Sequence, residues 1–159
     1  MPSARGQHLL DAEGLSAALV ALTVGDATIS LHRGHDPLPW FFKEGPEGGT
    51  LSHGASAVYG VPVGEQRIIG GFLPDRGTTV DVYAGGGLVA PVTAPGAWLA
   101  SVPRSATARV VGRRGDGEVQ ESESPPMPKP PFKLQQRPPI LSRLRRRFAR
   151  LERGIADYR

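Results

Sequence analysis

The sequence predicts a mainly β chain, either an antiparallel β-sandwich or a small barrel, followed by a Pro-rich disordered linker and a C-terminal amphipathic α-helix. Short apolar runs separated by Gly/Pro turns recur about every ten residues up to residue 120, as is typical of antiparallel sheets. Seven of the 16 prolines lie between residues 125 and 139. The last 20 residues place apolar side chains at helical spacing among seven arginines, which indicates a basic amphipathic helix.

These patterns divide the chain into four segments. They are a flexible N-terminus over residues 1–14, a β-domain over 15–120, a Pro-rich linker over 121–139 and a basic amphipathic helix over 140–159. The charge is divided as well, since residues 1–127 hold nine Lys/Arg and 13 Asp/Glu, whereas residues 128–159 hold ten and two. The net charges of −4 and +8 assign any preference for anionic partners to the tail.

The composition excludes several classes of site. The chain contains no cysteine, which excludes disulfides, thiolate nucleophiles and cysteine-bound metals. It has no uninterrupted apolar stretch of about 18 residues, and Asp11 and Glu13 place charges where a signal peptide would be apolar. We therefore expect a cytoplasmic protein without a transmembrane helix, and we expect no cofactor.

Residues 17–33 predict a β-hairpin, because apolar side chains alternate on both sides of the pair Gly25-Asp26. The competing interpretation is a helix over residues 9–20. Gly14 and the β-branched residues that follow it weaken that helix.

The next segment, residues 34–56, is rich in Gly and Pro and predicts a loop. Within it, Trp40, Phe41 and Phe42 are too apolar to leave in water, so we expect this aromatic cluster to lie against the sheet. An exposed aromatic patch that binds a partner is the alternative.

Seven further runs predict the remaining strands, over residues 57–63, 66–73, 78–84, 88–93, 97–102, 107–112 and 118–120. Two of them alternate clearly: Val82 opposes Asp81 in one, and Trp98 opposes Leu99 in the other. In each, the alternation predicts one buried face and one wetter face.

The pieces VYGVPVG, GAWLASVP and VVGRRGDGEV lie within residues 57–120, a range that covers about 40% of the chain. Over this range the sequence resembles small β-domains of uncharacterised actinobacterial proteins. The resemblance implies a β fold, and it implies no activity and no catalytic residue.

The densest group of metal-ligating residue types is His32, His35 and Asp36. Two imidazoles and a carboxylate could hold a metal whose bound water performs hydrolysis, so a small hydrolase is kept as an alternative. Gly34 breaks any helix that would gather these side chains, which favours histidines in turns or at the surface.

Other short motifs predict turns rather than chemistry. No G-x-S-x-G stretch is present, and the glycines at 85–87 fit a turn between strands better than a phosphate-binding loop. Arg114, Gly115 and Asp116 spell a tripeptide found in integrin ligands. Their position in an R-G-D-G stretch between two apolar runs predicts a turn instead.

The tail, residues 140–159, holds the side chains that we expect to bind a partner. Its apolar residues recur at intervals of three and four, which gathers them on one side of a helix. The expected contact residues are Leu141, Leu144, Phe148, Leu151, Ile155, Tyr158, Arg143, Arg146, Arg147 and Arg150. Because like charges three and four residues apart repel, this helix needs a surface that covers its apolar stripe.

Three kinds of surface could do so: an acidic or hydrophobic protein surface, including the chain's own body, an anionic membrane, and nucleic acid. Nucleic acid ranks last, since phosphates would leave the apolar stripe uncovered. With no catalytic constellation in view, we expect a non-enzymatic binding or adaptor module. Its β-domain is the scaffold and its tail is the docking element.

Overall fold

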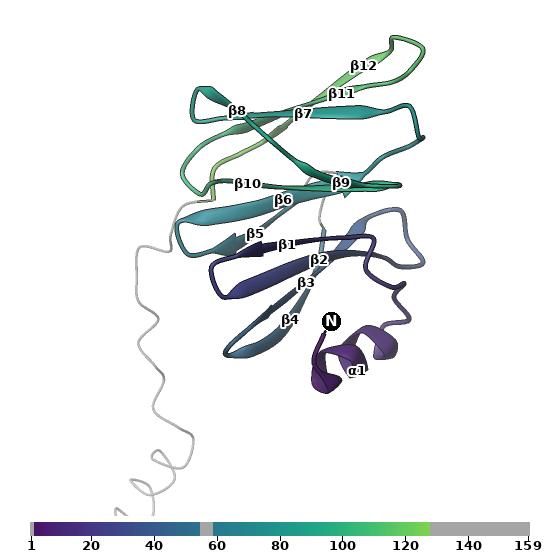
Figure 1. Cartoon of the computed structure of the whole chain (residues 1–159), viewed down its shortest axis with the longest axis vertical. Helices are drawn as coiled ribbons and strands as arrows, with labels where there is room; N and C mark the ends of the chain where they lie inside the picture. The colour runs from purple at the N-terminus through teal and green to yellow at the C-terminus, as the bar shows by residue number, and fades with distance from the viewer. Residues whose placement is uncertain (1, 55–58, 128–159) are drawn as a thin grey trace, which may run out of the picture. The chain divides into compact units, whose positions relative to one another are not determined.

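The structure is a computed structural model and describes residues 2–54 and 59–127. Within these residues the chain forms one helix and 12 strands, and the strands make three antiparallel sheets of four strands each. The sheets are stacked as three layers (Figure 1). The prediction of a mainly β fold is confirmed, and the described part contains no closed barrel.

The first sheet is a meander of β1 (Val20–Val24), β2 (Ala27–Arg33), β3 (Pro39–Gly45) and β4 (Gly48–His53), in this order. The hairpin predicted at Gly25-Asp26 is confirmed, since Val24 pairs with Ala27 across that turn. Gly25 has a φ of 60°, a conformation that glycine adopts without steric cost.

The loop predicted over residues 34–56 is wrong, because β3 and β4 form a second hairpin there. Of its three prolines, Pro37 lies before β3, Pro39 begins that strand and Pro46 lies in the turn after it, where a missing N–H does not interrupt the ladder. The aromatic cluster does lie against the protein: Phe41 and Phe42 are buried and Trp40 is half-buried.

The middle sheet has the order β5 (Tyr59–Val63), β6 (Gln66–Phe72), β10 (Ala97–Pro103), β9 (Val92–Ala94). The third sheet has the order β12 (Val119–Ser124), β11 (Ala108–Arg113), β7 (Thr79–Ala84), β8 (Gly87–Val89). The single strand predicted over residues 88–93 is therefore two strands that pair in different sheets. Pro91 lies between them, and its lack of an N–H suits the point where the chain crosses between layers (Figure 1).

Two apolar cores separate the three layers. The first core includes Ile29, Leu31, Phe41, Ile68 and Leu99, and the second includes Ile69, Val82, Trp98, Val102 and Val110. The wetter face predicted for residues 97–102 is wrong, because β10 contributes to both cores and a sheet covers each of its faces. The face separation predicted for residues 78–84 is confirmed, since Val82 is buried and Asp81 is partly exposed.

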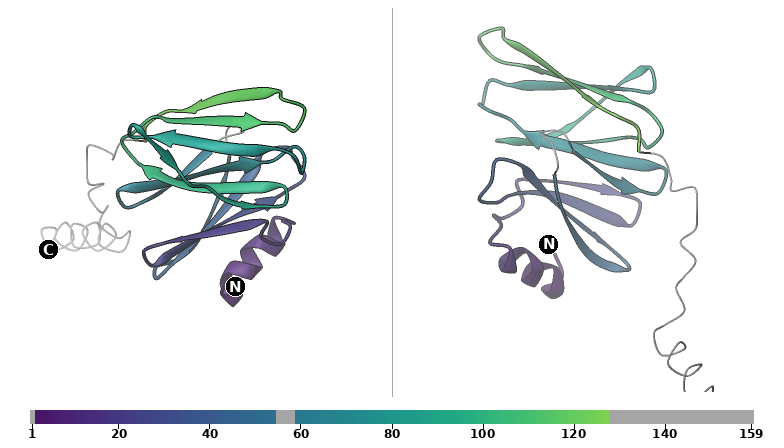
Figure 2. Two further views of the ribbon diagram at one scale, coloured as in Figure 1. Left: turned by 45° about the horizontal axis from the view of Figure 1, so that its top comes forward. Right: turned by 180° about the vertical axis from the view of Figure 1, so that it is seen from behind.

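The segment of residues 1–14, predicted to be flexible, contains helix α1 (Ala4–Ala12) instead. Ser3 caps its start, since the Ser3 hydroxyl accepts a backbone N–H of the first turn. Gly14, with a φ of 64°, follows its end, as is common where helices stop. Helix α1 lies beside the first sheet, on the side away from the middle sheet (Figure 2).

The body of the protein also extends further than predicted. Strand β12 runs to Ser124, and Met127 exchanges two hydrogen bonds with Arg104, each of 2.9 Å. Residues 121–127 of the predicted linker therefore belong to the body. The rest of that linker and the predicted helix, residues 128–159, lie outside the described residues.

A buried arginine joins the middle sheet to the third. Arg67 in β6 is 1% exposed, and its guanidinium donates to the Ser124 hydroxyl at 2.7 Å, the Ser124 carbonyl at 2.9 Å and the Ala106 carbonyl at 2.9 Å. Its Nε has no acceptor among the described residues. Burial lowers the pKa of Arg67, but arginine keeps its proton in proteins. Three neutral acceptors therefore compensate a buried charge.

Replacing this arginine tests how strongly it holds the sheets together. Arg67→Met should lower the free energy of unfolding by about 2–4 kcal/mol, because it leaves the acceptors of Ser124 and Ala106 buried without a donor. Urea unfolding followed by tryptophan fluorescence measures the change. Arg109→Met, which removes a surface pair with Glu121, is the matched control and should be nearly neutral. Equal urea midpoints for the two variants would contradict the assignment.

Candidate functional site: a cleft beneath the N-terminal helix

A cleft of about 710 Å³ lies between α1, the segment that follows it, and the first three strands of the first sheet. We call it the α1 cleft. It is lined by Pro2, Gln7, Leu10, Asp11, Leu15, Ser16, Ala17, Ala18, Ala21, Asp26, Thr28, Ser30, His32, Phe42, Glu44 and Gly45. Its volume falls in the range typical of sites for small ligands.

The alternation of β2 supplies the polar groups of this cleft. Ile29 and Leu31 point into the first core, so Thr28, Ser30 and His32 share the opposite face. Along this face burial increases from Thr28, which is exposed, through Ser30, which is half-buried, to His32, which is buried. The cleft is therefore open at the Thr28 end and closed at the His32 end.

Two hydrogen bonds define the protonation of His32. Its Nδ1 lies 2.8 Å from the Ser16 carbonyl oxygen, which can only accept, and its Nε2 lies 2.7 Å from the Ser30 hydroxyl. In the neutral ring, Nδ1 therefore carries the proton and Nε2 accepts from Ser30. Burial lowers the pKa of His32, and the hydrogen bond with Ser16 opposes this effect only in part.

Apolar side chains make the closed end of the cleft. Phe42 is 2% exposed and Leu10 is 3% exposed, and the Phe42 ring meets the His32 ring edge to face, with centroids 6.5 Å apart. Gly6 of α1 allows the helix to approach Phe42, since a Cβ there would lie 2.7 Å from the ring. The approach of helix and sheet thus depends on a residue without a side chain.

Among the described residues, three carboxylates and no lysine or arginine line the cleft. Glu44 accepts the Ser3 amide at 2.9 and 3.1 Å, and hydrogen bonding with the Ser3 side chain, followed by that with its amide, lowers the pKa of the Glu44 carboxyl. Asp11 accepts from the Gln7 side chain at 2.7 Å, and Asp26 is the third acid. The cleft is negative as a result, which favours cationic ligands.

The structure does not gather His32, His35 and Asp36 into one site. Asp36 binds His53, with 2.9 Å between Oδ2 and Nε2, and this hydrogen bond is the main cause of the lowered pKa of Asp36. The His53 ring stacks on Trp40 with centroids 4.2 Å apart, whereas His32 contacts Ser16 and Ser30. No group of three metal-ligating side chains forms within residues 2–54 and 59–127.

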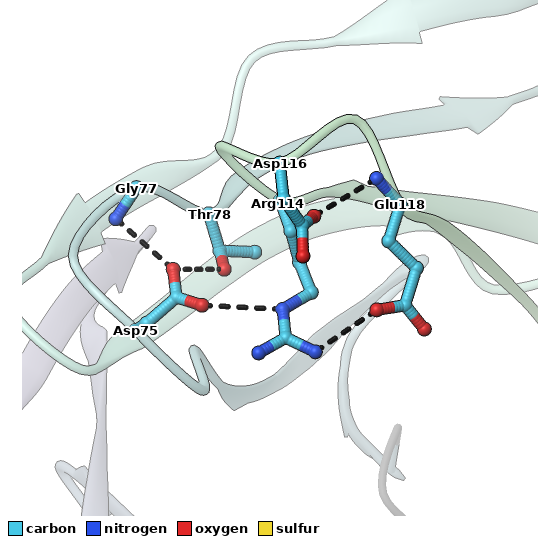
Figure 3. A network of polar contacts seen from close by, with 6 residues as sticks. All are labelled: Asp75, Gly77, Thr78, Arg114, Asp116 and Glu118. Atoms are coloured by element: carbon cyan, nitrogen blue, oxygen red, sulfur yellow. Dashed lines mark hydrogen bonds and ion pairs between the residues drawn. The ribbon is translucent and has the colours of Figure 1, made fainter.

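The R-G-D stretch forms a turn between β11 and β12, as predicted. Arg114 pairs with Asp75 at 3.2 Å and with Glu118 at 3.0 Å (Figure 3). Asp116 accepts the Glu118 amide at 3.0 Å, and Asp75 also accepts from Thr78 at 2.7 Å. These contacts tie two loops to each other, which gives the arginine a structural role.

The predicted partner-binding residues of the tail lie outside the described residues. They are Leu141, Leu144, Phe148, Leu151, Ile155, Tyr158, Arg143, Arg146, Arg147 and Arg150. The α1 cleft was not predicted, because it depends on α1 and on the segment after it. Ser3 and Gly14 are ordinary signals for the start and end of a helix, and together they could have revealed α1.

Comparison with known proteins finds no matching family model, no matching curated protein and no matching solved structure. The resemblance over residues 57–120 therefore stays a prediction. In the described part of the chain, no helix is long and apolar enough to cross a bilayer.

The lowered pKa of His32 predicts a pH dependence of stability. As the pH falls below 6.5, the ordinary pKa of histidine, the unfolded chain binds a proton that the folded chain does not, so the free energy of unfolding should fall as the pH drops from about 7.5 to about 5.5. His32→Asn keeps an amide donor for the Ser16 carbonyl but does not titrate, and should lose part of this dependence. Urea unfolding at both pH values measures it. An unchanged pH slope would show that His32 is not the group responsible.

Proposed function

We propose that this chain is a binding or adaptor module whose α1 cleft receives a cationic, partly apolar ligand such as a basic peptide segment. The observation that carries the proposal is the composition of the cleft wall: Asp11, Asp26 and Glu44 stand around an apolar end, with no lysine or arginine among the lining residues. Apolar contact supplies affinity, while a few placed polar groups select the ligand.

The closed end and the acids have separate roles in this proposal. Phe42 and Leu10 are already buried, so an apolar group of the ligand would cover the exposed residues Ala17 and Ala18 of the cleft wall. Because Glu44 is held by the Ser3 amide, its charge stays in place when no ligand is bound. A preorganised charge costs less to use than one that must be ordered on binding.

The tail has a second, independent part in the proposal. Residues 140–159 dock on an acidic or hydrophobic protein surface, with an anionic membrane or nucleic acid as the alternatives. The support is the charge of +8 in residues 128–159 and the 3,4 spacing of the apolar residues from Leu141 to Tyr158. No cofactor enters either part.

Neutralising two acids tests the cleft. The double variant Asp11→Asn, Glu44→Gln should weaken binding of a fluorescein-labelled Lys/Leu peptide at least about fivefold, since each acid attracts the peptide charge. Fluorescence anisotropy at low and high salt measures the affinity, which salt should reduce. The control variant Asp81→Asn, Glu121→Gln makes the same charge change on the third sheet. The proposal fails if both variants bind alike or if a Glu/Leu peptide binds as well.

Truncation tests the tail. Deleting residues 138–159 should abolish recovery of the protein partner from native lysate and leave the body folded, because the described body ends before this segment. Circular dichroism and urea unfolding check the fold of the truncated chain. A full-length variant with Leu144→Ser and Phe148→Ser should also lose the partner while keeping every arginine. Unchanged recovery in both would refute tail docking.

A further inference from the structure

We propose that the α1 cleft is also an acyl-transfer centre, in which Ser30 is the nucleophile, His32 is its general base, and the substrates are carboxylic esters that carry a positive charge. The charge preference of the substrate rests on the proposed function of the cleft. The chemistry itself rests on the geometry of Ser30 and His32, and can be tested separately.

The first step of the argument is the contact between the two side chains. Ser30 and His32 are two residues apart in β2, so the strand places them on the same face. The Ser30 hydroxyl lies 2.7 Å from His32 Nε2, within the range for a nucleophile and its base. Both line the cleft, and Ser30 stands on the open side of His32.

The second step is the orientation of the base. A catalytic histidine needs a third group that holds its ring and selects the tautomer. Here the Ser16 carbonyl accepts from Nδ1 at 2.8 Å, which leaves Nε2 free to take the serine proton. Phe42 meets the ring edge to face, and at 1% exposure His32 has little freedom to turn. Ser16 is thus a positioning residue that acts through its main chain.

The third step concerns charge. Burial favours the neutral ring, which lowers the pKa of His32 and keeps Nε2 available as a base at neutral pH. Ala17 and Ala18 line the same cleft, and no hydrogen bond from their amides is found among the described residues. Backbone amides of this kind can stabilise the oxyanion that forms when an ester carbonyl is attacked.

The reaction then balances without a further reactant except water. Ser30 Oγ forms a bond to the ester carbonyl carbon as its proton passes to His32 Nε2. The carbon–oxygen bond to the alcohol breaks, and the alcohol leaves with that proton. Water, deprotonated by His32, then attacks the acyl-serine. The acid is released, and Ser30 regains its proton from His32.

A fluorophosphonate probe tests the nucleophile directly in the full chain. The activated hydroxyl should displace fluoride and gain one phosphonyl group, which intact mass spectrometry measures. Trypsin releases residues 6–33 as one peptide, and fragmentation distinguishes Ser30 from Ser16 in it. The adduct should lie on Ser30. Ser30→Ala should remove it, while Ser122→Ala, a half-buried strand serine of the third sheet, should label like the parent.

His32→Asn provides the second arm, because it keeps a donor for Ser16 but has no base for Ser30. Its labelling rate should fall about 100-fold, as expected for loss of a general base, with urea unfolding as the check on its fold.

Absence of an adduct in the folded parent, or equal labelling in Ser30→Ala, overturns the proposal. Peptide binding by the parent is measured separately: an adduct on Ser30 without binding of the Lys/Leu peptide contradicts only the proposed function, and peptide binding without an adduct contradicts only the chemistry. A cationic aryl ester should be hydrolysed at least tenfold faster than its neutral analogue if the acids select the substrate.

Discussion

The stacking of the middle sheet on the third depends on the contact of Arg67 with the end of β12. The side chain starts in the middle sheet, and its guanidinium reaches Ser124 and the carbonyl before β11. A charge buried without a carboxylate is costly, so the arrangement holds only while all three acceptors are in place. Ser124 is the last residue of its strand. The same contact therefore holds the end of β12 in place.

Because the middle sheet is covered on both faces, the first and third sheets each present one outer face. These two outer faces differ in what they carry. The third sheet faces outward with charged ladders, such as Arg109 with Glu121 and Arg113 with Asp81. On the outer face of the first sheet, α1 packs closest to β4. The α1 cleft lies beside the helix and is lined by residues of β1, β2 and β3, Ser30 among them.

The sequence pattern predicted the local features of this fold and missed those that depend on distant segments. The hairpin at Gly25 and most strand positions follow from alternation and turn residues within a few positions of each other. The burial of both faces of β10 does not follow from the sequence in this way. Alternation distinguishes the two faces of a strand, but it cannot show that another sheet covers each face. Arg67 looks like a surface residue until Ser124, 57 positions later, is placed beside it. For the candidate site, the spacing of Ser30 and His32 is visible in the sequence. Recognising the pair as part of a cleft also required β3, which was predicted to be a loop, and α1, which was predicted to be flexible.

The hydrogen bonds of His32 fit the proposed nucleophilic serine better than they fit a metal site. A metal ligand must present an imidazole nitrogen with a free lone pair, but Nδ1 is protonated and donates to Ser16, and Nε2 accepts from Ser30. A metal at Nε2 would displace the Ser30 hydroxyl, and its second and third ligands would have to come from Asp11, Asp26 or Glu44. Glu44 already accepts the Ser3 amide, and Asp11 already accepts from Gln7. Transfer of one proton between Ser30 and His32 disturbs none of these contacts, so the existing hydrogen bonds favour a nucleophilic serine over a metal-bound water.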